Sequence, residues 1–165
     1  MAAVTTLPAA FVSGDVLTAA QMNALRGAFR VLQVVSATYA TSTTSSTNTY
    51  VDTGLTVTIT PSSTSSKVLV LVSQNGCVKL SSDTELGLKL MRGATDLGVF
   101  CIQGGLTSSG ANNGFGSASH VYLDSPATTS ATIYKTQMRS IANSASVNTQ
   151  SNGTQSGIVV MEISA

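Results

Sequence analysis

The sequence predicts an all-β fold, a sandwich or barrel of short strands, with one short helix before it. Three observations support this prediction. From residue 31 onward, apolar and β-branched residues alternate with polar ones or form short runs, which is typical of strands. Clusters of Ser, Thr, Asn and Gly separate these runs. Roughly eight or nine strands joined in this way form sandwiches or barrels.

A short amphipathic helix is expected at the N-terminal end, beginning near Thr18. Thr18 can cap the helix, and Gln21, three residues later, completes a capping box. Apolar residues then recur every three or four positions and form one stripe. Gly27 weakens the helix interior, so the helix needs a partner surface. The residues expected to dock on that partner are Leu17, Met22, Leu25 and Phe29.

The first β segments follow directly. Residues 31–39 are rich in β-branched residues. Leu55, Val57 and Ile59 alternate with threonines, the pattern of a half-buried strand, and Pro61 ends it. Residues 67–73 (KVLVLVS) form a continuous apolar run, which predicts a strand buried on both faces.

The second half continues in the same way. Residues 86–90 alternate, a turn follows at 92–96, and residues 97–102 return as the hairpin partner. Further strands are expected at 118–123, 131–140 and 157–164, and polar loops at 41–49, 62–66, 104–117 and 142–153. Loops as long as 104–117 are often functional. Its candidate receptor-facing residues are Asn112, Asn113 and Phe115.

The composition excludes some classes of partner. Charged residues are 9% of the chain and the net charge is +1, against about 25% charged residues in an average soluble protein. The 24 Ser and 23 Thr supply the polar surface instead. No basic face for nucleic acid is evident, and no apolar stretch suits membrane insertion. Charge near zero favours association between copies, and a weakly charged monomer is the alternative. Without a signal peptide, synthesis in a cytoplasm is expected.

Catalytic groups are sparse, so we expect no enzyme activity. His120 is the one histidine, and no G-x-S-x-G motif presents a serine nucleophile. Asp83 and Glu85 are a carboxylate pair of the kind used in glycoside hydrolysis, but a solvated turn explains them better. No metal-ligand spacing or phosphate loop is present, so no metal or cofactor is expected. Cys77 and Cys101 are expected to be free thiols.

Several segments resemble bacteriophage virion proteins. Residues 13–23 (SGDVLTAAQMN) resemble an opening found near the N-termini of phage minor structural and tail-fibre proteins. Residues 49–55 (TYVDTGL), 59–62 (ITPS) and 66–70 (SKVLV) are similar to a block of phage fibre domains. Residues 124–126 (DSP), 133–137 (IYKTQ) and the ending 160–163 (VMEI) resemble the C-terminal half of those domains.

A fainter resemblance concerns the fold. Residues 88–93 (LKLMRG) and 156–160 (SGIVV) resemble the jelly-roll heads of C1q- and TNF-like trimers. This implies an antiparallel jelly-roll sandwich (C1q/TNF-like) that forms a homotrimer with a dry axial interface.

The expected organisation has two parts. Residues 1–32 are a docking segment for other virion proteins of the tail, portal or capsid, and residues 33–165 are a β-sandwich head. The expected function is a trimeric phage fibre or appendage, made in the bacterial host cytoplasm, which adsorbs to a host surface glycan or protein. One alternative is a capsid decoration protein that stabilises the shell. A glycan-cleaving tail enzyme is the remote alternative.

Overall fold

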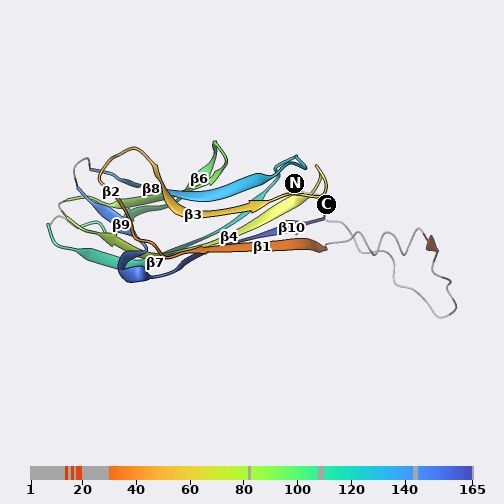
Figure 1. Cartoon of the computed structure of the whole chain (residues 1–165), viewed down its shortest axis with the longest axis horizontal. Coiled ribbons are helices and arrows are strands. Elements are labelled where there is room, and N and C mark those ends of the chain that lie inside the picture. Colours follow the sequence, from red (N-terminus) through yellow and green to blue (C-terminus); the bar gives the residue numbers. More distant parts are fainter. Residues whose placement is uncertain are drawn as a thin grey trace.

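The computed structural model describes residues 14, 16, 18, 19, 30–81, 83–107, 110–142 and 145–164. From Val31 to Ile163 the described residues form two facing layers of antiparallel strands (Figure 1). In chain order the elements are β1 (Val31–Tyr39), β2 (Thr43–Ser45), β3 (Val51–Ile59), β4 (Lys67–Lys79), β5 (Leu86–Arg92), β6 (Thr95–Gly104), β7 (Asn113–Asp124), β8 (Thr132–Ser140), β9 (Val147–Thr149), the 3-10 turn η1 (Ser151–Gly153) and β10 (Ser156–Ile163).

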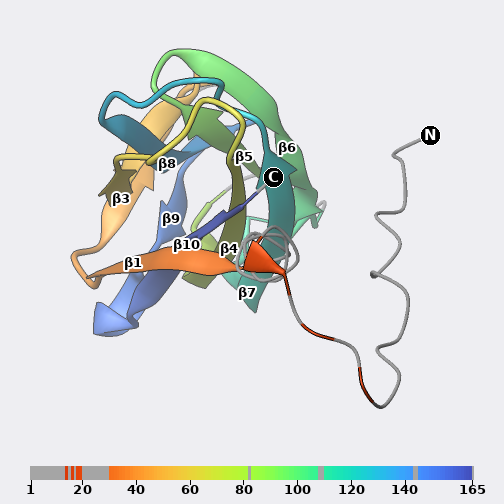
Figure 2. The ribbon, with the colours of Figure 1, turned by 90° about the vertical axis from the view of Figure 1, so that its right-hand side faces the viewer.

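The strand order is that of a jelly roll. Sheet A has the order β1-β10-β4-β9-β2, and β7 pairs with β4 along its length. Sheet B has the order β3-β8-β5-β6. Viewed along the strands, the two sheets enclose one interior (Figure 2). The predicted all-β jelly-roll sandwich is therefore confirmed. The expected N-terminal helix lies almost wholly outside the described residues, and β1 begins two residues before the expected domain boundary at residue 33.

The core follows from alternation along the strands. Leu55, Val57 and Ile59 of β3 face inward, as expected, and pack against the inward residues of β4 and β10. This main cluster contains Leu55, Val57, Ile59, Val68, Val70, Val72, Leu90, Tyr134, Ile158 and Val160. A smaller cluster lies further along the sandwich and contains Cys77, Leu86, Leu88, Met138 and Val147.

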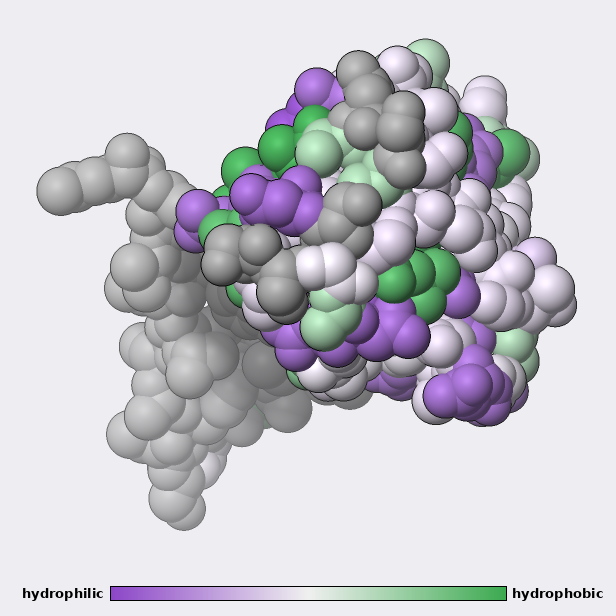
Figure 3. Space-filling model, turned by 90° about the vertical axis from the view of Figure 1, so that its left-hand side faces the viewer, coloured by the Kyte–Doolittle hydropathy of each residue, from purple (hydrophilic) through white to green (hydrophobic). Residues whose placement is uncertain are grey.

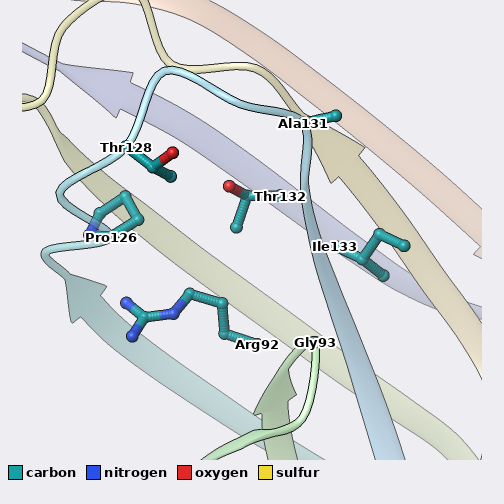
Figure 4. Close-up of a pocket in the computed structure, with 7 residues that line it drawn as sticks. All are labelled: Arg92, Gly93, Pro126, Thr128, Ala131, Thr132 and Ile133. Carbon is teal, nitrogen blue, oxygen red and sulfur yellow. The ribbon is translucent and has the colours of Figure 1, made fainter.

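Polar side chains, of which Asp124 and Tyr134 are buried, connect the two sheets. Nη1 of Arg92, at the end of β5, lies 2.8 Å from both carboxylate oxygens of Asp124, at the end of β7. The hydroxyl of Tyr134, on β8, donates to Asp124 at 2.6 Å. Burial and the contact with Asp124 raise the pKa of Tyr134 far above its usual value. A hollow of about 250 Å³ lies beside Arg92, with Pro126 and Thr128 on its wall (Figure 4).

Three expected loops are wrong in part. The loop at 104–117 is shorter, because β6 extends to Gly104 and β7 begins at Asn113. The loops at 41–49 and 142–153 contain the short strands β2 and β9, which pair with each other. In all three cases, pairing with a neighbouring strand supplies hydrogen-bond partners for the backbone N–H and C=O groups. This outweighs the weak strand propensity of Gly, Ser and Asn.

Candidate functional site

One outer face of the sandwich is apolar. Register pairing places Val34, Met161, Leu69 and Leu123 in one row across β1, β10, β4 and β7. The adjacent row holds Ser36, Val159, Leu71 and Val121. All of these residues point away from the core, because their neighbours in sequence point into it. We call the apolar residues of the two rows the apolar face: Val34, Leu69, Leu71, Val121, Leu123, Val159 and Met161.

The rim of the apolar face is strongly exposed. Val34, Val121 and Leu123 are 56%, 63% and 58% exposed. The central residues on β4 and β10 are half-buried only because neighbouring strands flank them. The expectation that residues 67–73 are buried on both faces is therefore wrong for this chain alone, since Leu69 and Leu71 face outward. An apolar row on an outer face is typical of an interaction surface.

The apolar face carries almost no charge. Among the described residues of β1, β10, β4 and β7, Lys67 is the one charged side chain that points outward. It lies at the margin, where its ammonium donates to the Ser125 hydroxyl at 2.7 Å. The other charged residues of these strands point inward and are buried: Lys79, Asp124 and Glu162.

The outer face of sheet B has the opposite character. Lys89 pairs with Asp96 at 3.1 Å, and Lys135 pairs with Asp52 at 2.8 Å. Lys89 and Arg139 lie 4.5 Å and 4.8 Å from the centroid of the Tyr50 ring, on which both cations pack. Burial raises the pKa of Tyr50 and outweighs the lowering by Arg139. The sandwich thus has a charged, hydrated face and an uncharged apolar face.

The structure describes the expected receptor-facing residues but not the expected docking residues. The docking residues Leu17, Met22, Leu25 and Phe29 lie outside the described residues. Asn112 is exposed, as a receptor-facing residue must be. Asn113 begins β7, and its side-chain amide donates to the Gly105 carbonyl at 3.1 Å.

Phe115 is expected to face outward, but it does not. It lies on β7 and packs against the smaller core cluster. A bulge in the pairing of β7 with β4 accompanies the change in register here, and such bulges redirect side chains. Phe115 is therefore better explained as part of the core.

The candidate catalytic residues do not come together as a site. His120 shares the inward side of β7 with Tyr122, as its parity predicts, and stacks on Phe100 with ring centroids 5.2 Å apart. Burial lowers the pKa of His120. Asp83 is exposed whereas Glu85 is buried. Within the described ranges, no group of three or more His, Cys, Asp or Glu residues could hold a metal ion.

The two cysteines are free thiols, as expected. Burial, with a smaller contribution from the neighbouring Cys101, raises the pKa of Cys77 to about 12. Burial also raises the pKa of Cys101, which is less enclosed. In the part of the chain that the structure describes, no helix is long and apolar enough to cross a membrane.

The apolar face has a sequence signal of its own. Residues 67–73 and 157–163 are apolar at consecutive positions, so each strand offers one apolar side to the core and one to the outside. Sequence alone does not show which partner covers the second side. A second layer of the same chain and a second molecule both fit a continuous apolar run.

Comparisons with known proteins do not identify a family for this chain. No protein-family model matches the chain, and no curated protein matches it. Among solved structures, it is similar to the crystal structure of the infectious bursal disease virus VP2 subviral particle, with 12% sequence identity and a TM-score of 0.41. The match covers 79% of this chain but only 32% of that one, so this chain spans about a third of its length.

Proposed function

We propose that this chain is a bacteriophage virion structural protein: a homotrimeric fibre or appendage that attaches through its N-terminal segment and projects the β-sandwich. The apolar face is the observation that carries this proposal, together with the resemblance of the sequence to phage fibre proteins. In this proposal the protein is made in the host cytoplasm, is carried in the virion and contributes to adsorption on the host surface.

A second copy of the chain is the partner that fits the apolar face best. Four strands spaced about 4.8 Å apart, over about five residues of 3.4 Å each, cover roughly 300 Å² of sheet. A patch of this size equals the largest found on many monomers and is often functional. A charged partner would lose hydration here without forming ion pairs. A second copy presents an uncharged surface of the same kind, so its binding removes no charged group from water.

The ends of the described chain support attachment through the N-terminal segment. The backbone N–H of Arg30 donates to the Ser164 hydroxyl at 3.0 Å, and the N–H of Ser164 donates to the Arg30 carbonyl at 2.9 Å. Residue 30 and the end of β10 therefore lie side by side at one end of sheet A (Figure 1). Copies packed with parallel strands would bring residues 1–29 together at that end. The docking residues Leu17, Met22, Leu25 and Phe29 would then act as a cluster.

Sedimentation of the full chain and two matched variants tests the assembly. Val121 and Val99 are both exposed valines, at 63% and 50%, but Val121 lies on the apolar face and Val99 on the edge strand of sheet B. We expect the wild type and Val99→Glu to sediment as trimers and Val121→Glu as a folded monomer. A wild-type monomer at high concentration contradicts the proposal, and so does a Val121→Glu variant that remains trimeric.

Imaging of the intact particle tests the place of the protein in the virion. A fibre or tail appendage requires few copies, located at the tail or portal. A capsid decoration protein, the alternative function, requires hundreds of copies spread over the shell. The full-chain variants Met22→Asp and Phe29→Asp should abolish incorporation into particles while leaving the trimer intact. Incorporation at the wild-type level would show that these residues do not dock.

A further inference from the structure

A polar cup lies between β4, β7 and the turn η1. Its volume is about 320 Å³. Gly76 of β4 and Gly114 and Gly116 of β7 form one side, and Ser151, Asn152 and Thr154 form the other. Every residue that lines the cup is uncharged. Cys77 and Val78 complete the lining. The cup therefore offers backbone, neutral polar side chains and a small apolar area to anything that enters it.

The turn η1 lies far from residue 30. It directly precedes β10, and the last residues of β10 pair with the first residues of β1. Along β4, Gly76 lies five residues beyond Leu71, so the cup lies past the end of the apolar face. Figure 3 shows the end of the sandwich remote from residue 30, where residues of intermediate hydropathy separate small hydrophilic and hydrophobic groups.

The backbone around the cup has a constrained shape. Gly76 and Gly116 have φ values of +62° and +85°, and Asn152 has a φ of +56°. A Cβ atom at Gly76 would collide with the Thr154 hydroxyl and the Ser151 backbone nitrogen. A non-glycine residue in the left-handed region is uncommon, and such residues gather where ligands bind. The turn is thus held against Gly76 of β4 by close packing.

Two side chains in the cup have unused hydrogen-bonding capacity. The Ser151 hydroxyl and the Asn152 amide form no hydrogen bond with any described residue. Thr154 donates its hydroxyl proton to the Ser151 carbonyl at 2.9 Å, which leaves its oxygen lone pairs available. The set therefore offers both donors and acceptors without charge. A Cβ at Gly114 would meet no atom closer than 3.9 Å and one at Gly116 none within 4 Å, so these two glycines allow a ring to approach the backbone of β7 closely.

We propose that the cup binds a neutral, hydroxyl-rich ligand: one sugar residue of a glycan. Hydroxyl groups act as both donor and acceptor, which matches the Ser151, Asn152 and Thr154 set. The volume is at the lower end of the range of about 300–1,000 Å³ for ligand pockets, which suits a single ring. The absence of charge in the lining favours neutral hexoses and N-acetylhexosamines over acidic sugars. This inference does not depend on the proposed trimer.

Saturation-transfer NMR on the full chain tests the inference with four free sugars: glucose, galactose, N-acetylglucosamine and N-acetylgalactosamine. We expect at least one of them to bind, with a Kd of about 1 mM. Asn152→Gly removes the amide and also relieves the left-handed backbone. Gly114→Val fills the cup, and a Cβ at Gly114 meets no other atom closer than 3.9 Å.

Both variants should weaken binding at least tenfold while circular dichroism and melting temperature stay close to those of the wild type. Thr58→Val, an exposed strand residue of sheet B, is the matched control and should bind like the wild type. No saturation transfer to any of the four sugars overturns the inference. Undiminished binding by Asn152→Gly and Gly114→Val overturns it as well, because the sugar would then bind elsewhere.

Discussion

Replacing Glu162 with glutamine tests how the two sheets are joined at the end where β1 begins. Glu162 is fully buried on β10. One carboxylate oxygen accepts a hydrogen bond from the Gln33 side chain of β1 at 2.6 Å. The other accepts bonds from the backbone N–H and the hydroxyl of Ser62, both at 2.7 Å. Ser62 follows β3 of sheet B, so this carboxylate connects the sheets.

The pKa of Glu162 gives the size of its contribution to the free energy of unfolding. Burial alone would raise the pKa, but the hydrogen bonds from Gln33, Ser62 and Ser66 outweigh burial and lower it from 4.5 to about 2. At 1.36 kcal/mol for each pH unit, this difference corresponds to roughly 3 kcal/mol. Because the folded-state pKa is depressed, the stabilisation is fully present above about pH 4.5 and disappears as the pH falls toward 2. A glutamine at position 162 cannot supply this stabilisation. It carries no charge, and its NH₂ group would face the Gln33 donor instead of accepting a hydrogen bond from it.

Urea unfolding of the wild type and Glu162→Gln, at equal protein concentration, measures the effect. At pH 7 we expect the variant to be less stable by about 3 kcal/mol, and the difference should shrink to near zero at about pH 2. Asp83→Asn, at an exposed carboxylate, is the control and should change stability by less than about 0.5 kcal/mol. A difference between wild type and Glu162→Gln that stays constant from pH 7 to about pH 2 would refute the reasoning.

Three further substitutions probe other parts of the fold. Arg92→Met leaves the buried Asp124 carboxylate without its cation and should lower the free energy of unfolding by about 3–5 kcal/mol, measured by urea denaturation. Gly76→Ala places a Cβ against the η1 turn in a left-handed backbone, and calorimetry should show a loss of at least about 2 kcal/mol. At pH 8, iodoacetamide should label the native Cys101→Ser protein, which keeps Cys77, far more slowly than Cys77→Ser, which keeps Cys101. The reason is that the Cys77 thiol is buried and has a pKa of about 12. Equal labelling rates would contradict this.

The strands with regular patterns could be predicted from the sequence. Residues 31–39 coincide with β1, and the alternation of Leu55, Val57 and Ile59 identifies the inner side of β3. Their periodicity reflects burial of one side, which local sequence records directly. The parity of His120 on β7 is correct for the same reason.

The short strands could not be predicted in this way. Residues 147–149 and 43–45 have polar sequences, and they become β9 and β2 because each finds a partner. Pairing between segments about 100 residues apart has no local signature. The inward position of Phe115 also depends on a bulge against β4. The polar cup requires the same long-range information, since it joins residue 76 to the turn at 151–153.

The position of β1 determines how the sandwich responds to mechanical load. β1 is an edge strand whose hydrogen-bonding partner in sheet A is β10, to which it runs antiparallel. A pull between residue 30 and the far end of the sandwich acts along the strands, so the hydrogen bonds between β1 and β10 share the force. A pull between residue 30 and residue 164, which lie side by side, opens the same bonds one after another. The molecule is therefore strong against a load along its strands and weak when residues 30 and 164 are drawn apart.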